Sequence, residues 1–359
     1  MVTAVDEIIG NPQVINFAPN QILNSIMPNT AVEDHWDLLL EGTLTLANYT
    51  TAPSKFVEAL ENLIYTVQVS ASAAVPGGVN EVFKNCDAAY FRFITNLYTQ
   101  QDVTRTDIGT TNAAFDFLTT PRVNFGDPLA VDAKTGKKCG SKYFLDARLL
   151  SASGLQLNIG FRDQTAMVFG GVGGTATLSA TSVQVKARHY FGIPNQTAQG
   201  ATIARLYLRE VQQQYPVLQT GISQQFTNLR TGAVLHRLTL KGLVAPSTTG
   251  VSFADPSDLP LGSNFTREAG PLLVLQVNNN AYTPLSSVYS QLQNADVKLF
   301  QLANVWRAGY NVFEPSTSHA IQGMLNLRGA VNMILTADTE VESTPTSIQL
   351  SYVERVKPQ

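Results

Sequence analysis

Two eleven-residue stretches of similar sequence decide the fold: "TSVQVKARHYF" at 181–191 and "TSIQLSYVERV" at 346–356. Each begins with Thr-Ser, continues with a β-branched residue and Gln, and then has another aliphatic residue. Apolar and polar residues alternate along both, as in Val183, Gln184 and Val185. This alternation is typical of a β-strand with one buried face. One stretch lies mid-chain and the other near the end, which raises the hypothesis of a duplicated domain.

Three further pairs of short segments recur in the same order in the two halves. The pairs are "LLLEGTLTL" (38–46) with "LTLKGLV" (238–244), which matches Leu38 to Leu238 and Leu40 to Leu240, "YTVQVS" (65–70) with "VLQVN" (274–278), and "LDAR" (145–148) with "LNLR" (325–328). Short aliphatic strings recur by chance. Four pairs in one order, with only the intervening lengths changing, nevertheless indicate an internal repeat.

The spacing of apolar residues predicts mostly strands. Alternation with a period of two also runs through 38–46, 155–161 and 330–337. Clusters of Gly, Pro, Asn and Ser separate these segments, and few helical patterns lie between them. This arrangement favours antiparallel β-sandwiches over alternating strand–helix units. We therefore predict an all-β fold class with a few inserted helices, built as two similar sandwiches in tandem.

One amphipathic helix is predicted in each half. Apolar residues recur every three or four positions in 81–98 and again in 283–304, which is the period of a helix with one buried face. The uncharged stretch 192–200, "GIPNQTAQG", is the best linker candidate. The predicted organisation is an N-terminal domain over 1–192 with a short N-terminal arm, a linker over 193–200, and a C-terminal domain over 201–359.

The composition favours a chain with large protein-contacting surfaces. Only 14% of its 359 residues are charged, against about 25% in typical globular proteins. The net charge is −3 and the basic residues are scattered, so no nucleic-acid groove is indicated. No apolar run reaches the length of a membrane span, and the first thirty residues lack the pattern of a secretory signal. Cys86 and Cys139, the two cysteines, make neither a disulfide framework nor a metal motif.

The four histidines do not form a metal motif. None lies two or four positions from another or close to a cysteine, and they are His35, His189, His236 and His319. Zinc and iron sites usually draw on such clusters. The segment "GGVGG" at 170–174 is followed neither by Lys-Ser/Thr nor by a helix, so we interpret it as a hairpin tip rather than a phosphate loop. We predict no catalytic residue, no cofactor and no metal, and thus a protein that is not an enzyme.

Three further features have more than one interpretation. The segment "DHWD" at 34–37 places two carboxylates around Trp36, which suits an acid/base or sugar-stacking cluster, although its position favours a turn leading into the following strand. The segment "TAVDEII" at 3–9 suits a short helix that contacts a membrane or partner, and equally ordinary terminal packing. Arg148 and Arg328 occupy matching places in the two halves, where we expect structural ion pairs.

Long segments of the chain resemble double jelly-roll major capsid proteins. These segments are "LLLEGTLTLANYT", "LENLIYTVQVSAS", "FLDARLLSASGLQLNIGF" and "LNLRGAVNMILTADTEVESTPTSIQLSYVERV". The family includes coat proteins of icosahedral viruses with an internal membrane, in the lineage that contains adenovirus hexon. The compact size is most similar to the coats of small lipid-containing bacteriophages, such as those that infect Flavobacterium. The resemblance implies two eight-stranded jelly rolls in tandem.

The resemblance also implies a function. It suggests a major capsid protein that assembles as pseudo-hexameric homotrimers into an icosahedral shell around a membrane and genome. The implied partners are neighbouring trimers, penton and minor capsid proteins, and the internal viral membrane, without sequence-specific nucleic acid. The implied location is the virion, after synthesis in the host cytoplasm, and loops 125–140 and 246–265 are the expected tower or inter-capsomer contacts. Two alternatives stay open: a tandem β-sandwich protein that binds or acts on carbohydrate, and a spike or minor capsid protein.

Overall fold

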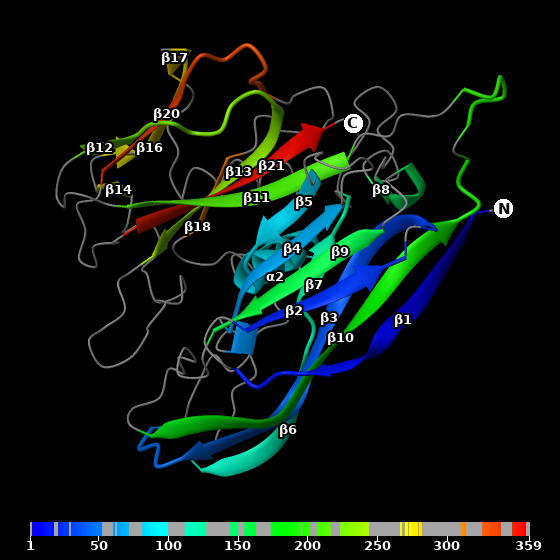
Figure 1. The fold of residues 1–359 in the computed structure, drawn as a ribbon. Coiled ribbons are helices and arrows are strands. Elements are labelled where there is room, and N and C mark those ends of the chain that lie inside the picture. The colour runs from blue at the N-terminus through cyan, green and yellow to red at the C-terminus, as the bar shows by residue number, and fades with distance from the viewer. Residues whose placement is uncertain are drawn as a thin grey trace.

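The computed structural model shows a chain made mostly of β-strands (Figure 1). It describes residues 2–17, 21–28, 30–51, 60–61, 63–71, 81–99, 112–126, 144–149, 154–162, 174–194, 196–201, 207–216, 223–243, 266–267, 270–271, 273–278, 280–281, 310–313, 325–338 and 347–356. The predicted helix over 283–304, loop 246–265, Cys139, His319 and most of loop 125–140 and of "GGVGG" lie outside these residues.

The N-terminal sandwich, formed by strands β1 to β10, has two sheets. The order in the first sheet is β1 (Thr3–Val14), β10 (Thr175–Phe191), β3 (Val32–Ala47) and β6 (Ala113–Thr119), with the short β7 (Arg122–Asn124) and β8 (Leu145–Asp146) also pairing with β3. The second sheet runs β2 (Gln21–Met27), β9 (Leu155–Phe161), β4 (Ile64–Ala71) and β5 (Glu81–Cys86). Long strands that are distant in sequence therefore lie side by side.

The C-terminal sandwich, formed by strands β11 to β21, repeats this order. Its first sheet contains β11 (Tyr207–Pro216), β21 (Ser347–Val356), β13 (Val234–Leu243) and β18 (Tyr310–Phe313), with β19 (Leu325–Asn326) pairing with the start of β13. Its second sheet runs β12 (Ser223–Phe226), β20 (Met333–Asp338), β16 (Leu273–Val277) and β17 (Asn280–Ala281). A separate hairpin joins β14 (Thr266–Arg267) and β15 (Gly270–Pro271). The shared order is that of a jelly roll, so the predicted fold class is confirmed.

A matching β-bulge fixes how the two halves correspond. Between β10 and β3 the pairing skips Asp34, and between β21 and β13 it skips His236. When the bulges are aligned, Leu38, which pairs with Val185, corresponds to Leu240, which pairs with Leu350. The match of the two opening stretches keeps its register. The predicted match of Leu38 with Leu238 is wrong by two residues, a shift that leaves the same face buried.

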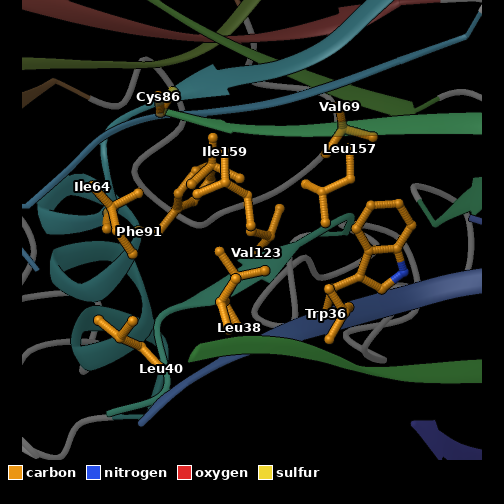
Figure 2. Close-up of a cluster of buried hydrophobic side chains, with 14 of the residues drawn as sticks. Trp36, Leu38, Leu40, Ile64, Val69, Cys86, Phe91, Val123, Leu157 and Ile159 are labelled. Atoms are coloured by element: carbon orange, nitrogen blue, oxygen red, sulfur yellow. The ribbon is translucent and has the colours of Figure 1, made fainter. Parts of the chain in front are cut away.

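Each sandwich encloses its own hydrophobic core. The first contains buried side chains between Ile15 and Tyr207, and the second contains those between Val211 and Tyr352. Figure 2 shows part of the first core, where Trp36 and Leu38 of β3 point toward residues of the opposite sheet such as Leu157. Burying each large apolar side chain contributes about 1.5–3 kcal/mol, so these contacts hold the two layers together.

Two predicted helical segments have a different structure. The helix expected over 81–98 begins later, as α2 (Ala88–Thr99), and β5 occupies the residues before it. Asp87 caps this helix, because its Oδ1 accepts a hydrogen bond of 2.7 Å from the backbone N–H of Tyr90. The segment 3–9, for which a short helix was one interpretation, belongs to strand β1, which pairs with β10.

Candidate assembly interface

The two sandwiches meet where β11 lies beside β5. The two strands are parallel, with Glu210 opposite Lys84 and Val211 opposite Asn85. They join the second sheet of the N-terminal sandwich to the first sheet of the C-terminal sandwich, and Figure 1 shows β5 and β11 adjacent at this junction. We call the contact between residues 81–87 and 207–212 the seam. The described strands on its two sides thus form one continuous sheet.

A buried ion pair lies at the centre of the seam. Lys84 Nζ is 3.2 Å from Glu210 Oε2, and both side chains are almost fully buried. Such a pair adds little net stability compared with apolar residues, but it leaves a costly uncompensated charge when one partner is removed. A shift of β11 by one residue along β5 would place both charges away from their partners. The pair therefore fixes the register of the junction.

Further side chains reinforce the seam on either side of the ion pair. The Tyr207 hydroxyl donates a hydrogen bond to the Glu81 carboxylate, and the Tyr207 ring packs edge-on against Phe83 with centroids 4.9 Å apart. Burial raises the pKa of Glu81, while the nearby Arg209 opposes this shift. At the other end, Gln212 Oε1 accepts a hydrogen bond of 2.8 Å from the backbone N–H of Asp87. The junction is thus a packed interior rather than a flexible linker contact.

The segment 34–37 has neither of the structures that its sequence suggested. It lies inside β3 rather than in a turn before it. Trp36 is completely buried, and its indole N–H donates a hydrogen bond of 2.7 Å to Glu33 Oε2, so its ring is closed to a sugar. Asp37 accepts two hydrogen bonds, of 2.7 and 3.0 Å, from the Arg122 guanidinium. Both the turn and the sugar-stacking interpretation of Trp36 are therefore wrong.

A buried carboxylate–imidazole contact links strands β3 and β10. His189 Nδ1 lies 3.0 Å from Glu33 Oε2, and both side chains are almost fully buried. The Glu33 carboxylate raises the pKa of His189 more strongly than burial lowers it. Since Glu33 also accepts the Trp36 hydrogen bond, this group joins the core to the bulge at Asp34. Its role is structural, because it is enclosed by the sandwich.

The matching arginines are held differently in the two halves. Arg148 makes two hydrogen bonds to Asp146, of 2.8 and 2.7 Å, and donates a third to the Ile193 carbonyl. This confirms the expected structural ion pair for Arg148. At the corresponding place, the backbone N–H of Arg328 donates to Asn326 Oδ1 at 3.1 Å.

The described residues offer no obvious centre for chemistry. No group of three or more His, Cys, Asp or Glu among them is arranged to hold a metal ion. Cys86 is buried, and burial is the main cause that raises the pKa of its thiol, which keeps it protonated. No helix in the described ranges has both the length and the apolar character needed to cross a bilayer.

The open side of the N-terminal sandwich exposes apolar residues on its edge strands. On β1 and β2 these are Val5, Ile8, Val14, Ile22 and Ile26. A groove of ≈340 Å³ lies between the two strands, and Gln13 Nε2 bridges it by donating to Ser25 Oγ at 2.8 Å. Edge strands with apolar side chains are candidate sites for pairing with another chain.

Sequence reasoning missed the residues that form the seam. Lys84 lies in a stretch whose apolar spacing fits a helix, where a lysine belongs on the solvated face. Glu210 lies in a polar run, "REVQQQ" at 209–214. The available signal was Asp87 itself, because Asp favours the cap position at the start of a helix.

Comparisons with known proteins identify the fold. No protein-family profile and no curated protein matches the sequence. The crystal structure of the STIV major capsid protein is 12% identical, with 99% of this chain and 97% of that chain covered and a TM-score of 0.64. The PBCV-1 virus capsid is 14% identical, with 99% of this chain and 94% of that chain covered and a TM-score of 0.56. The major capsid protein P2 of bacteriophage PM2 is 8% identical, with 99% of this chain and 98% of that chain covered and a TM-score of 0.54. This chain has the double jelly-roll fold of these proteins.

Proposed function

We propose that the chain is a major capsid protein that assembles as pseudo-hexameric homotrimers into an icosahedral shell around a membrane and genome. One observation carries the proposal: two jelly rolls of the same strand order are fused edge to edge through a buried seam. Three copies of such a chain present six similar lobes. A threefold assembly can then fill a roughly hexagonal place in a lattice.

The likeness to capsid proteins supports this role because it spans the whole architecture. Each of the three compared structures covers 99% of this chain and at least 94% of its own length. Single β-sandwiches occur in many proteins with unrelated functions. A pair of jelly rolls joined in this order is a more specific arrangement. The composition agrees, since a surface with few charges suits large contacts between copies.

The finer parts of the proposal derive from this role. Its domains are 1–192 and 201–359 with a linker over 193–200, and the chain is not an enzyme. Its partners are other copies of itself, penton and minor capsid proteins, and the internal membrane, with no sequence-specific nucleic acid. It is made in the host cytoplasm and resides in the virion.

The test is the mass of the purified full-length chain in solution, followed by electron microscopy of particles formed from it. We expect a stable species of three chains and pseudo-hexagonal units in a closed shell. A chain that stays monomeric at micromolar concentration would overturn the proposal. A trimer found at only a few copies in purified particles would instead indicate a spike or minor capsid protein.

A further inference from the structure

The seam inside the chain has a counterpart that is still open. The aligned bulges place β1 of the N-terminal sandwich where β11 lies in the C-terminal one, since each is the edge strand beside the last long strand of its sandwich. In the same way β5 corresponds to β17, because each is the edge strand beyond β4 or β16. The seam uses β5 and β11. The corresponding edges, β17 and β1, each pair on one side only within the described part of the chain.

The burial of the two corresponding strands differs sharply. The first five residues of β11 are buried or half-buried on both faces of the strand. The first six residues of β1 are exposed on both faces, including Val5 at 39% and Ile8 at 56%. In β11 it is the neighbouring sandwich that excludes water, through β5. The strand β1 therefore has apolar side chains and a free edge where its counterpart has a neighbour.

We propose that the β1 edge binds the β17 edge of a second copy of this chain, by a parallel strand contact that repeats the seam. The proposal rests on the proposed function, in which three copies close into a ring. A head-to-tail contact of this kind closes when each junction turns by the same angle. If the seam and the contact between copies are alike, six similar junctions surround the ring. Exposed strand edges provide the backbone donors and acceptors that such pairing requires.

The seam also predicts the register of this contact. Through the pairing with β10 and β21, Asp6 corresponds to Glu210, and both are acidic. Through the pairing with β4 and β16, and the match of "VQV" with "LQV", Asn280 corresponds to Lys84. Because Glu210 lies opposite Lys84 in the seam, Asp6 of one copy lies opposite Asn280 of the next. Paired residues in neighbouring strands fall within the Cα separation that a disulfide spans.

Cysteine cross-linking of the full chain tests this register. In a Cys139→Ser background, the Asp6→Cys/Asn280→Cys variant is oxidised and run on a non-reducing gel beside each single-cysteine variant. We expect covalently linked trimers from the double variant only. The matched control is Leu118→Cys/Asn280→Cys, because Leu118 is 63% exposed on β6, at the opposite edge of the same sheet. This pair is expected to give no linked trimers.

A second variant tests the same edge without covalent cross-linking. Ile8→Glu places a charge on the exposed β1 edge and is expected to weaken the trimer by at least about tenfold in native mass measurements, whereas Leu118→Glu leaves it unchanged. Circular dichroism checks that both variants stay folded. If the chain forms trimers but the Asp6→Cys/Asn280→Cys variant does not cross-link, or if the control variant cross-links equally well, the edge assignment is wrong. The capsid proposal would still stand. A monomer in the parent chain would overturn both.

Discussion

The two sandwiches have a buried ionisable side chain at corresponding positions, but it is a histidine in the first sandwich and a glutamate in the second. Beside the bulge in the N-terminal sandwich, the imidazole of His189 faces the carboxylate of Glu33. The aligned bulges place Glu354 where His189 lies. There, Glu354 is held by Arg209 at 2.6 Å and by Arg230 at 2.7 Å. In both halves a buried ionisable side chain beside an irregular strand pair lies close to a group of opposite charge type.

This difference shows what the duplication preserved. The strand order, the bulge and the buried face correspond in the two halves. Not every interior residue does, since the place of Trp36 in the first core corresponds to Leu238 in the second. Interiors accept different side chains when total volume and pattern are kept. Topology is therefore the shared property, and each core has its own packing solution.

The largest expected effect comes from breaking the junction between the two halves. Lys84→Ala leaves Glu210 buried without its partner, so we expect the free energy of unfolding to fall by about 3–5 kcal/mol. Urea unfolding at a fixed protein concentration measures this. The double variant Lys84→Met/Glu210→Leu removes both charges and should recover most of the loss. Parent-like unfolding of the single variant would show that the pair does not hold the seam.

A smaller effect distinguishes corresponding positions in the second sheets. Gly160 of β9 leaves room for the Tyr65 ring, and a Cβ placed there would lie 2.6 Å from that ring. Gly160→Ala should therefore cost about 1–3 kcal/mol by overpacking. The corresponding residue in β20 is Thr336, which is half-buried, and Thr336→Ala should cost less than about 1 kcal/mol. Equal unfolding midpoints for the two variants would contradict the expected overpacking at Gly160.

The smallest effect is a pH dependence that arises from His189 in the N-terminal sandwich. Because Glu33 raises the pKa of His189 in the folded chain, the stabilisation is fully present below about pH 6.5, the ordinary value for histidine. It is lost as the pH rises through the higher folded value. The stability difference between the parent and His189→Gln should therefore shrink from pH 6 to pH 8.5. Thermal unfolding of the two proteins at several pH values measures this difference.

Much of the fold could be predicted because it depends on the alternation of apolar residues. The expected strands at 155–161 and 346–356 match β9 and β21 closely, and 181–191 forms the second part of the longer β10. The repeat was visible because four short matches kept their order. Its register was wrong by two residues at Leu38, since a shift of two keeps the same face buried and leaves no trace in the apolar pattern.

The seam could not be predicted, for a physical reason. In 81–86 the side chains of Phe83 and Lys84, which are neighbours in sequence, are both buried. The pairing of β5 with β4 skips Phe83, which interrupts the alternation of faces there, and Glu210 of the second sandwich contacts Lys84. A burial pattern imposed by a distant segment does not follow the period of a strand. The apolar spacing of Val82 and Cys86 then imitates a helix turn, and a lysine gives no sign that it will be enclosed.

The parallel junction also bears on how the chain is made at the ribosome. Every strand of the N-terminal sandwich lies between residues 3 and 191, before β11 begins at Tyr207. This sandwich can close while the rest of the chain is still being synthesised, as domains generally do. The edge of β5 is then a finished template on which β11 aligns as the first strand of the second sandwich. Protease digestion of arrested nascent chains should show a resistant N-terminal fragment once residue 191 has left the exit tunnel.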